Sequence, residues 1–296
     1  MDPVSLVTVN GDVMRRADAI AAGVSRPAIA RALAGGELIA PAHGVLALPT
    51  VSPAALAAAS ARARLTCVSA VAQAGLPVMG RPRLTHVATS TRGHGPQAHG
   101  ALRVHFANEV GRSLAPMPVA AALDHAGRCV GERAHLVMLD AALRAGLVKG
   151  GDLASWTATG GRRRSWLLEH CDPRAESAQE TLARIDLVEG GLRAVPQVYV
   201  DGVGRVDLMV EGVLALEIDG RGYHDGDDAF TRDRRRDRTM LRGGVPTARF
   251  TAAEIERARR GELAREVRGI LGALGQRVQA DRNAGGSAPR PQFGSL

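Results

Sequence analysis

The chain has 296 residues, of which 45% are hydrophobic and only 3% are aromatic, and its formal net charge is +8. This length can hold two or three domains. The sequence has neither a run of about 18 apolar residues nor an N-terminal signal pattern. We therefore expect a cytoplasmic protein without a membrane segment. The positive charge favours nucleic acid as a partner, although nearly all of it is arginine in an Ala- and Gly-rich sequence, which codon bias would also produce.

The first 50 residues are predicted to form a winged helix-turn-helix domain. We expect one short helix over Val13–Ala22 and a second over Ala28–Ala34, with Ser25 as the N-cap of the second. The stretch Leu38–Pro49 then reads as two short β runs, which is the size of a wing. In helix-turn-helix proteins the second helix lies in the major groove of DNA, with its first residues against the base edges.

Arg26 directly follows the predicted N-cap Ser25 and Arg31 lies within the second helix, so we predict that both contact DNA. The alternative is a small winged domain that serves as a protein–protein adaptor. The blocks Asp18–Gly23, Ser25–Ala34 and Gly44–Leu48 resemble the N-terminal winged-helix domain of AbiEi-type antitoxins, which belong to type IV toxin–antitoxin systems. The resemblance implies DNA as a partner and also a cognate toxin or defence partner.

Residues 51–170 are predicted to form a small α/β middle domain, like the segment that follows the winged domain in AbiEi-type proteins. Apolar periodicity and turn residues together give the order of its elements. The expected elements are helices over Ala54–Arg64, Leu65–Leu76, Val119–Ala126 and Glu132–Ala145, and strands over Leu84–Ser90 and Leu102–Phe106.

We predict no chemistry for this middle domain. His94, His99 and His105 are interpreted as solvated side chains, because two of them lie in a Gly/His-rich loop without a second ligand at a fixed helical spacing. Asp124 and Asp140 lie on predicted helices and are interpreted as capping or surface charges.

The three cysteines are Cys67, Cys129 and Cys171. They are odd in number and far apart, so they indicate neither a disulfide framework nor the closely spaced pairs that are typical of zinc sites. We therefore predict that they are buried or idle thiols.

Residues 171–276 are predicted to form a C-terminal α/β domain, and residues 277–296 a disordered tail rich in Gly, Ser, Pro and Arg. The whole chain is thus predicted to be an α/β (α+β) multidomain protein. The expected elements of the last domain are helices over Ala175–Glu189, Asp227–Arg242 and Ala252–Leu274, and strands over Val195–Asp201, Arg205–Val210, Val213–Asp219 and Thr247–Thr251.

Three carboxylates lie on the predicted hairpin of this domain: Asp207 on its first strand, and Glu217 and Asp219 at the end of its second. Glu217 and Asp219 are two residues apart, so their side chains point to the same face of a strand. An acid pair on an otherwise apolar strand is costly without a compensating charge, and Mg²⁺ or Mn²⁺ suits carboxylate oxygens. The alternative is an exposed strand face that ends in an Asp-Gly turn.

The order of these pieces resembles the PD-(D/E)xK nuclease superfamily, and within it the Vsr-like (very short patch repair) endonucleases. The resemblance covers roughly 100 residues in order, and implies a restriction-endonuclease-like αβββαβα fold. The matching pieces are Ser177–Glu180, Gln197, Arg205–Asp207, Glu217–Gly220, Tyr223–His224, Asp233–Asp237 and Arg249–Thr251.

Carried over to this sequence, the resemblance implies that Asp207 and Glu217 bind Mg²⁺ or Mn²⁺ and that Glu180 completes the acidic site. Asp219 occupies the place where the superfamily usually has lysine, and this domain contains no lysine. His224 is then the predicted base, because a histidine can exchange a proton near neutral pH.

Two arginines follow the acids in the predicted charged helix. Arg234 or Arg236 is expected to offset the charge on the phosphorus centre, and both are predicted to contact DNA phosphates. The alternative is that this helix is a solvated ladder of salt bridges.

Two functions from different classes are consistent with these patterns. The first is a metal-dependent DNA endonuclease, targeted or regulated by the winged domain, in phage defence or DNA repair. The second is a DNA-binding transcriptional regulator or AbiEi-type antitoxin whose nuclease fold is inactive, which the missing lysine motivates. In both cases we expect no membrane partner and no small-molecule cofactor.

Overall fold

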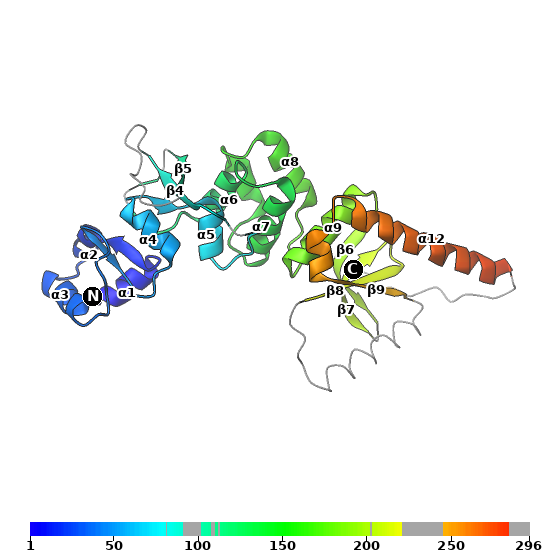
Figure 1. The fold of residues 1–296 in the computed structure, drawn as a ribbon, viewed down its shortest axis with the longest axis horizontal. Helices are drawn as coiled ribbons and strands as arrows, with labels where there is room; N and C mark the ends of the chain where they lie inside the picture. The colour runs from blue at the N-terminus through cyan, green and yellow to red at the C-terminus, as the bar shows by residue number, and fades with distance from the viewer. Residues whose placement is uncertain are drawn as a thin grey trace. The chain divides into compact units, whose positions relative to one another are not determined.

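The computed structural model describes residues 1–80, 82–90, 102–107, 110–111, 113–201, 203–220 and 245–283. The chain folds as two compact units, Met1–Glu169 and His170–Leu296, and each contains helices and sheets (Figure 1). This confirms the predicted mixed α/β class. Among the residues just given, no helix combines the length and the apolar character needed to cross a membrane.

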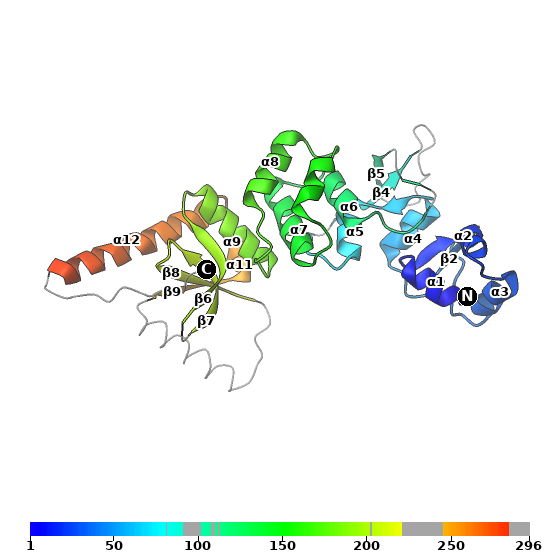
Figure 2. The same ribbon diagram turned by 180° about the vertical axis from the view of Figure 1, so that it is seen from behind.

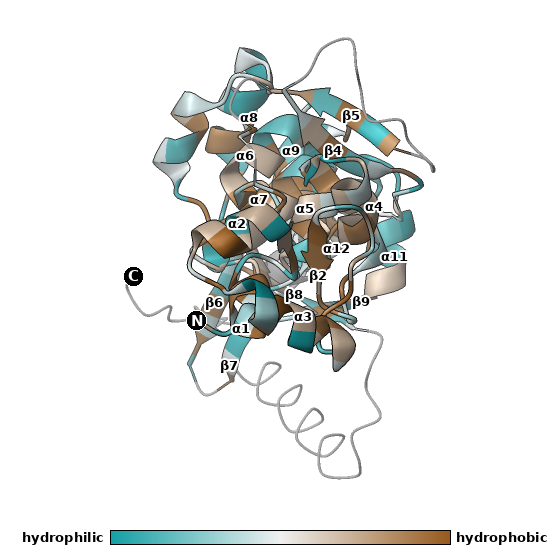
Figure 3. Cartoon of the chain, turned by 90° about the vertical axis from the view of Figure 1, so that its left-hand side faces the viewer, coloured by the Kyte–Doolittle hydropathy of each residue, from teal (hydrophilic) through white to brown (hydrophobic). Residues whose placement is uncertain are grey.

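The first unit begins with three short helices and a two-stranded antiparallel sheet. The helices are α1 (Pro3–Val9), α2 (Arg16–Ala21) and α3 (Arg26–Ala34), and the strands are β1 (Val13–Arg15) and β2 (Val45–Ala47). All three residues of β2 are buried, and the strand carries apolar colours in Figure 3. Residues from the helices and both strands share one core, which consists of Val7, Met14, Ala19, Val24, Ile29, Ala32, Leu38 and Leu46.

The start of this region differs from the prediction in two ways. The helix predicted over Val13–Ala22 is wrong in its first three residues, which form β1 because Met14 pairs with Leu46 of β2. A long-range pairing that buries this segment overrides a local helical pattern. The prediction also omits α1, whose first turn is capped by Asp2: its Oδ2 accepts the backbone N–H of Ser5 at 2.7 Å.

The rest of the first unit contains a three-stranded sheet in the order β3–β4–β5. Strand β4 (Thr85–Thr89) pairs antiparallel with β3 (Arg64–Leu65) and parallel with β5 (Leu102–Phe106). Helix α5 packs against β4 and against α6. The helices are α4 (Pro53–Ser60), α5 (Cys67–Gln73), α6 (Val119–Ala126), α7 (Glu132–Arg144), the 3₁₀ helix η1 (Gly150–Ser155) and α8 (Gly161–His170).

Two acids on these helices are buried, so their interpretation as capping or surface charges is wrong. Asp124 exposes 8% of its surface and Asp140 only 1%. The carboxylate of Asp124 accepts the backbone N–H groups of Thr157, Ala158 and Thr159 at 2.7–3.0 Å. It therefore anchors the segment that connects η1 to α8, because a buried carboxylate needs such donors.

The second unit is built on a four-stranded mixed sheet in the order β6–β7–β8–β9. Strand β7 is antiparallel to both β6 and β8, whereas β9 runs parallel to β8. Helix α9 packs against β6 and β7 and also against α11 and α12 (Figure 2). The elements are α9 (Ala178–Glu189), β6 (Ala194–Val200), β7 (Gly204–Val210), β8 (Leu214–Asp219), β9 (Thr247–Thr251), α11 (Ala252–Arg257) and α12 (Glu262–Asn283).

The predicted hairpin is confirmed. Glu211 and Gly212 have φ angles of +50° and +69°, and the N–H of Val213 donates to the carbonyl of Val210. Two consecutive positive φ angles are characteristic of the type I′ turn. Val210 pairs with Leu214, so Val213 is an additional residue between the turn and β8. The turn fixes the register of β7 against β8, and with it the position of the acids.

The helices of this unit differ from the prediction at their ends. The helix predicted over Ala252–Leu274 is divided into α11 and α12, and α12 continues to Asn283. Gly261 lies between the two helices with a φ of +78°, a conformation that favours glycine. The charged helix predicted over Asp227–Arg242 lies outside the described residues.

Candidate functional site

Two of the predicted acids lie on the adjacent strands β7 and β8. The antiparallel register runs as far as the pair Leu208–Leu216, and Asp207 and Glu217 are the next residues on the two strands. The Oδ2 atom of Asp207 accepts the backbone N–H of Ile218 at 2.7 Å, so the carboxylate is tied to the neighbouring strand. Glu217 exposes only 8% of its surface, which excludes the predicted alternative of an exposed strand face at this residue.

Asp219 follows two residues after Glu217 and is more exposed, at 46% of its side chain. Leu216 and Ile218 alternate with these acids and pack into the core beneath α9 and α12, so Glu217 and Asp219 point to the other face of the sheet. Arg249 of β9 lies opposite Glu217 in the parallel register, and its Nη1 is 3.6 Å from Oδ1 of Asp219. No role for this arginine follows from the sequence pattern alone.

Glu180 lies in the first turn of α9 and exposes 5% of its surface. Its Oε2 accepts the backbone N–H of Glu176 at 2.8 Å and the side-chain amide of Gln197 at 2.9 Å. Burial raises the pKa of the Glu180 carboxyl above its ordinary value, and the nearby charge of Asp207 raises it further. Glu180 and Asp207 are therefore electrostatically coupled.

Glu176, Glu180 and Arg184 are four residues apart, a spacing that is typical of a surface ladder of charges, but Glu180 and Arg184 are buried. Glu176 precedes the helix and pairs instead with Arg205 of β7, at 2.7 Å between the charged atoms. Arg184 exposes only 5% of its surface. Charged side chains this deeply buried are unusual unless they have partners.

Gln197 presents its amide to Glu180 from an unusual backbone conformation. Its φ angle is +56°, although it lies within β6. The register of β6 against β7 places it opposite Asp207. Left-handed backbone at a non-glycine residue costs on the order of 1 kcal/mol and is found most often where the surroundings fix it, as at functional sites.

The remaining predicted site residues divide between the two units. Arg26 is the first residue of α3 and Arg31 lies in its last turn, and both are exposed. His224, Arg234 and Arg236 lie outside the described residues.

A different group of side chains gathers in the first unit, where no chemistry was predicted. Cys67, His86, His105 and Cys129 bring one potential ligand atom each to within 4.8 Å of the others, and such a group could hold a metal ion. His105 exposes 8% of its surface, so its interpretation as a solvated histidine is wrong. Burial lowers the pKa of His105 to about 4 and raises the pKa of Cys67.

Among the described residues, the acids of the second unit do not form so close a group. Their donor set nevertheless differs in kind from the Cys/His set. Carboxylate oxygens suit hard ions such as Mg²⁺ and Mn²⁺, whereas thiols and imidazoles suit softer ions. The two units thus present two separate sets of candidate ligands.

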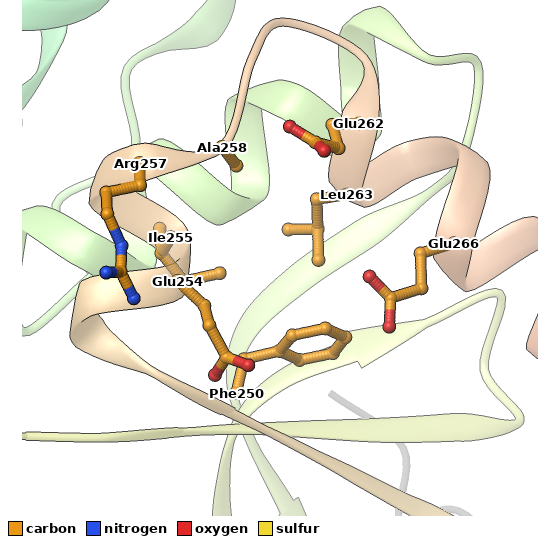
Figure 4. A pocket seen from close by; sticks show the side chains of 8 residues that line it. All are labelled: Phe250, Glu254, Ile255, Arg257, Ala258, Glu262, Leu263 and Glu266. Atoms are coloured by element: carbon orange, nitrogen blue, oxygen red, sulfur yellow. The ribbon is translucent and has the colours of Figure 1, made fainter.

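A cleft of about 230 Å³ lies between β9, α11 and α12 (Figure 4). Three of the residues that line it are glutamates, Glu254, Glu262 and Glu266, which would repel an anionic phosphate. None of the predicted acids lines it. We therefore do not place a nucleic-acid substrate there.

Comparison with known proteins adds no family to this description: the chain matches no protein-family model and no curated protein.

Proposed function

We propose that the second unit is a divalent-metal-dependent DNA endonuclease domain of the restriction-endonuclease-like type. The observation that carries the proposal is that Asp207 lies between the two other acids: its charge acts on the buried Glu180, and its carboxylate accepts the N–H of Ile218, the residue after Glu217. Asp207 and Glu217 are the residues that follow Leu208–Leu216, the last pair in the register of β7 against β8. Carboxylates on neighbouring elements suit Mg²⁺ or Mn²⁺, and a cation would offset their charge.

The element order of the unit supports the same proposal. The order along the chain is helix α9, the antiparallel strands β6, β7 and β8, then β9, which is parallel to β8, and finally helices α11 and α12. This agrees with the αβββαβα order implied by the resemblance to Vsr-like endonucleases. The helix expected before the last strand belongs to residues outside the described ranges.

In this proposal Asp207 and Glu217 hold the metal ion, and Glu180 contributes the third carboxylate. A bound Mg²⁺ would polarise the phosphoryl oxygen and lower the pKa of its water. Gln197 positions Glu180 by donating to its Oε2. His224 remains the proposed base for the attacking water.

Arg249 takes the place of the missing lysine in this account. It reaches Asp219, which stands at the lysine position, from the neighbouring strand. Its guanidinium is always charged and can donate to phosphate oxygens in a bidentate manner. We propose that it offsets the charge of the phosphate, together with Arg234 or Arg236.

Nicking of supercoiled plasmid by the purified full-length chain, with Mg²⁺ or Mn²⁺, tests the nuclease activity. We expect nicking by the wild type, and a loss of at least about a hundredfold in Asp207→Ala and Glu217→Gln, because both acids would hold the ion. Glu266→Gln is the matched control, since Glu266 is an acid of the same unit that lines the cleft instead. Absence of nicking by the wild type, or equal nicking by Asp207→Ala, would overturn the proposal.

A second candidate function is a DNA-binding regulator or AbiEi-type antitoxin with an inactive nuclease fold. Asp219 in place of lysine favours it, as do the exposed Arg26 and Arg31 on α3. In this case promoter binding survives Asp207→Ala but is lost in the Arg26→Ala, Arg31→Ala double variant. Arg144→Ala is the control, because Arg144 is an exposed arginine on a different helix.

A further inference from the structure

We propose that Cys67, His86, His105 and Cys129 bind one Zn²⁺ ion as a structural site of the first unit. The proposal does not depend on the nuclease activity, since it concerns the other unit and a different class of ligands. The sequence does not indicate this site, because consecutive members of the group are 19 to 24 positions apart and none belongs to a paired motif.

The fold brings the four residues together from four segments. Cys67 is the first residue of α5, and Cys129 follows the end of α6, which packs against α5. His86 lies on β4 and His105 on β5. The parallel register sets His105 opposite Ala88, two residues beyond His86, so both imidazoles are on the same face of the sheet.

The distances are those of ligands around a tetrahedral ion. Nδ1 of His86 lies 3.2 Å from Nε2 of His105, and Sγ of Cys129 lies 3.7 Å from the same nitrogen. Zinc–nitrogen bonds of about 2.0–2.1 Å and zinc–sulfur bonds of about 2.3 Å, arranged tetrahedrally, give separations of about 3.3 Å between two nitrogens and about 3.6 Å between nitrogen and sulfur. The group is therefore nearly preformed.

Neighbouring residues restrain the ring of His105 and the backbone that carries His86. The ring of His125 stacks on that of His105 at 5.3 Å between centroids, and its Nδ1 is 2.7 Å from Oγ1 of Thr66. The backbone N–H of His86 donates to Oγ of Ser69 at 2.9 Å.

Cys67 carries a further sign of a constrained position. Its φ angle is +53°, a left-handed conformation that is uncommon for residues other than glycine. It is also fully buried at the start of α5. Strained backbone of this kind persists only where the surrounding structure fixes the conformation, and it is common at binding sites.

The donor set identifies the ion and its role. Two thiolates with two imidazoles favour Zn²⁺, whereas Mg²⁺ and Mn²⁺ take oxygen ligands. Four protein ligands fill a tetrahedral shell and leave no position for a substrate, which is typical of a structural site. The ion would tie β5, at the edge of the three-stranded sheet, to α5 and to the end of α6.

Metal analysis of the full-length chain, purified without a metal-affinity tag, tests the proposal. We expect about one Zn²⁺ per chain, and zinc content at background in the Cys67→Ser, Cys129→Ser double variant. The matched control is Cys171→Ser, which removes the third cysteine, located in the second unit, and should keep its zinc.

Replacement of the ion by Co²⁺ tests the site in the wild-type chain, so the test does not depend on whether the double variant folds. The wild type and Cys171→Ser should both show the visible bands of tetrahedral Co²⁺ and a thiolate charge-transfer band. A folded wild-type chain that contains no zinc and takes up neither Zn²⁺ nor Co²⁺ would overturn the proposal. So would a Cys67–Cys129 disulfide in a peptide map of the freshly purified, unreduced protein.

Discussion

The charged form of Glu180 is needed for the proposed metal site, but it lowers the stability of the folded chain. Its Oε2 accepts two hydrogen bonds, which favour the charged form, but burial and Asp207 both raise its pKa and so favour the neutral form. The folded state therefore binds the proton of Glu180 more tightly than the unfolded chain does. Its contribution to stability is greatest at low pH and is lost as the pH rises through the folded pKa.

We accordingly predict that Glu180→Gln stabilises the metal-free protein at pH 7 while it abolishes nicking. Glutamine keeps an oxygen for the two donors and removes the buried charge, so Tm in excess EDTA should rise by about 2–4 °C, which corresponds to about 1 kcal/mol. Glu176→Gln is the control, since the side chain of Glu176 is exposed and makes a surface ion pair with Arg205, and the substitution keeps the backbone N–H that Glu180 accepts. A lower Tm for Glu180→Gln in EDTA would contradict this view of the site.

His135 gives the first unit a pH dependence of the opposite sign. The side chain is fully buried and stacks on Trp156 at 5.6 Å between centroids. Burial lowers its pKa from 6.5 to about 4. Between these two values the unfolded chain binds the proton and the folded chain does not, so the stabilisation is complete above pH 6.5 and is lost as the pH falls toward 4.

We predict that the unfolding free energy of the wild type falls by on the order of 3 kcal/mol more than that of His135→Phe between pH 6.5 and pH 4. Phenylalanine preserves the stacking but does not titrate. Tryptophan fluorescence during urea unfolding measures this difference, because both tryptophans, Trp156 and Trp166, lie in the first unit. Parallel pH profiles of the two proteins would exclude His135 as the cause.

At the scale of elements, α9 is the part of the second unit on which several others depend. Its first turn carries Glu180, and Asp186 in its last turn accepts the N–H groups of Gly261 and Ala264 at 2.7 and 3.2 Å, where α12 begins. Gly190 lets the two helices approach closely, since a Cβ at that position would lie 2.3 Å from Cβ of Ala264. The placement of α12 thus depends on one buried carboxylate and one glycine.

We predict that Asp186→Ala lowers the unfolding free energy of the second unit by about 2 kcal/mol, because it leaves helix N-terminal donors without their acceptor. The control, Glu189→Ala, breaks an ion pair with the exposed Arg260 and should cost no more than about 1 kcal/mol. Urea unfolding followed by far-UV circular dichroism, compared with tryptophan fluorescence of the first unit, measures both. Equal effects of the two substitutions would contradict the capping role.

Elements with strong local signals could be predicted from the sequence, and those set by distant pairing could not. The Glu211–Gly212 turn and the strands around it follow from turn chemistry and short apolar runs. Strand β1 could not be predicted, because it exists only through its pairing with β2. The ion pair of Arg249 with Asp219 could not be predicted for the same reason, because it depends on the parallel pairing of β8 with β9.

At the scale of the whole molecule, the chain combines two units with two different candidate metal sites. The acidic site could be anticipated, because Glu217 and Asp219 are close in sequence and Asp207 is one hairpin away. The Cys/His site could not, because its ligands come from two strands and two helix ends with no fixed spacing. The two sites should also respond differently to metal ions, since one offers oxygen ligands and the other sulfur and nitrogen.

The most direct test of the central claim is Mn²⁺ binding to the full-length chain, followed by electron paramagnetic resonance without DNA. We predict that the wild type and Glu266→Gln bind Mn²⁺ at the acidic site. Asp207→Ala and Glu217→Gln should bind Mn²⁺ at least about tenfold more weakly. Zinc occupancy of the Cys/His site should be the same in all four proteins. Equal Mn²⁺ affinity in the wild type and in Asp207→Ala would contradict the assignment of Asp207 as a metal ligand, and with it the proposed nuclease site.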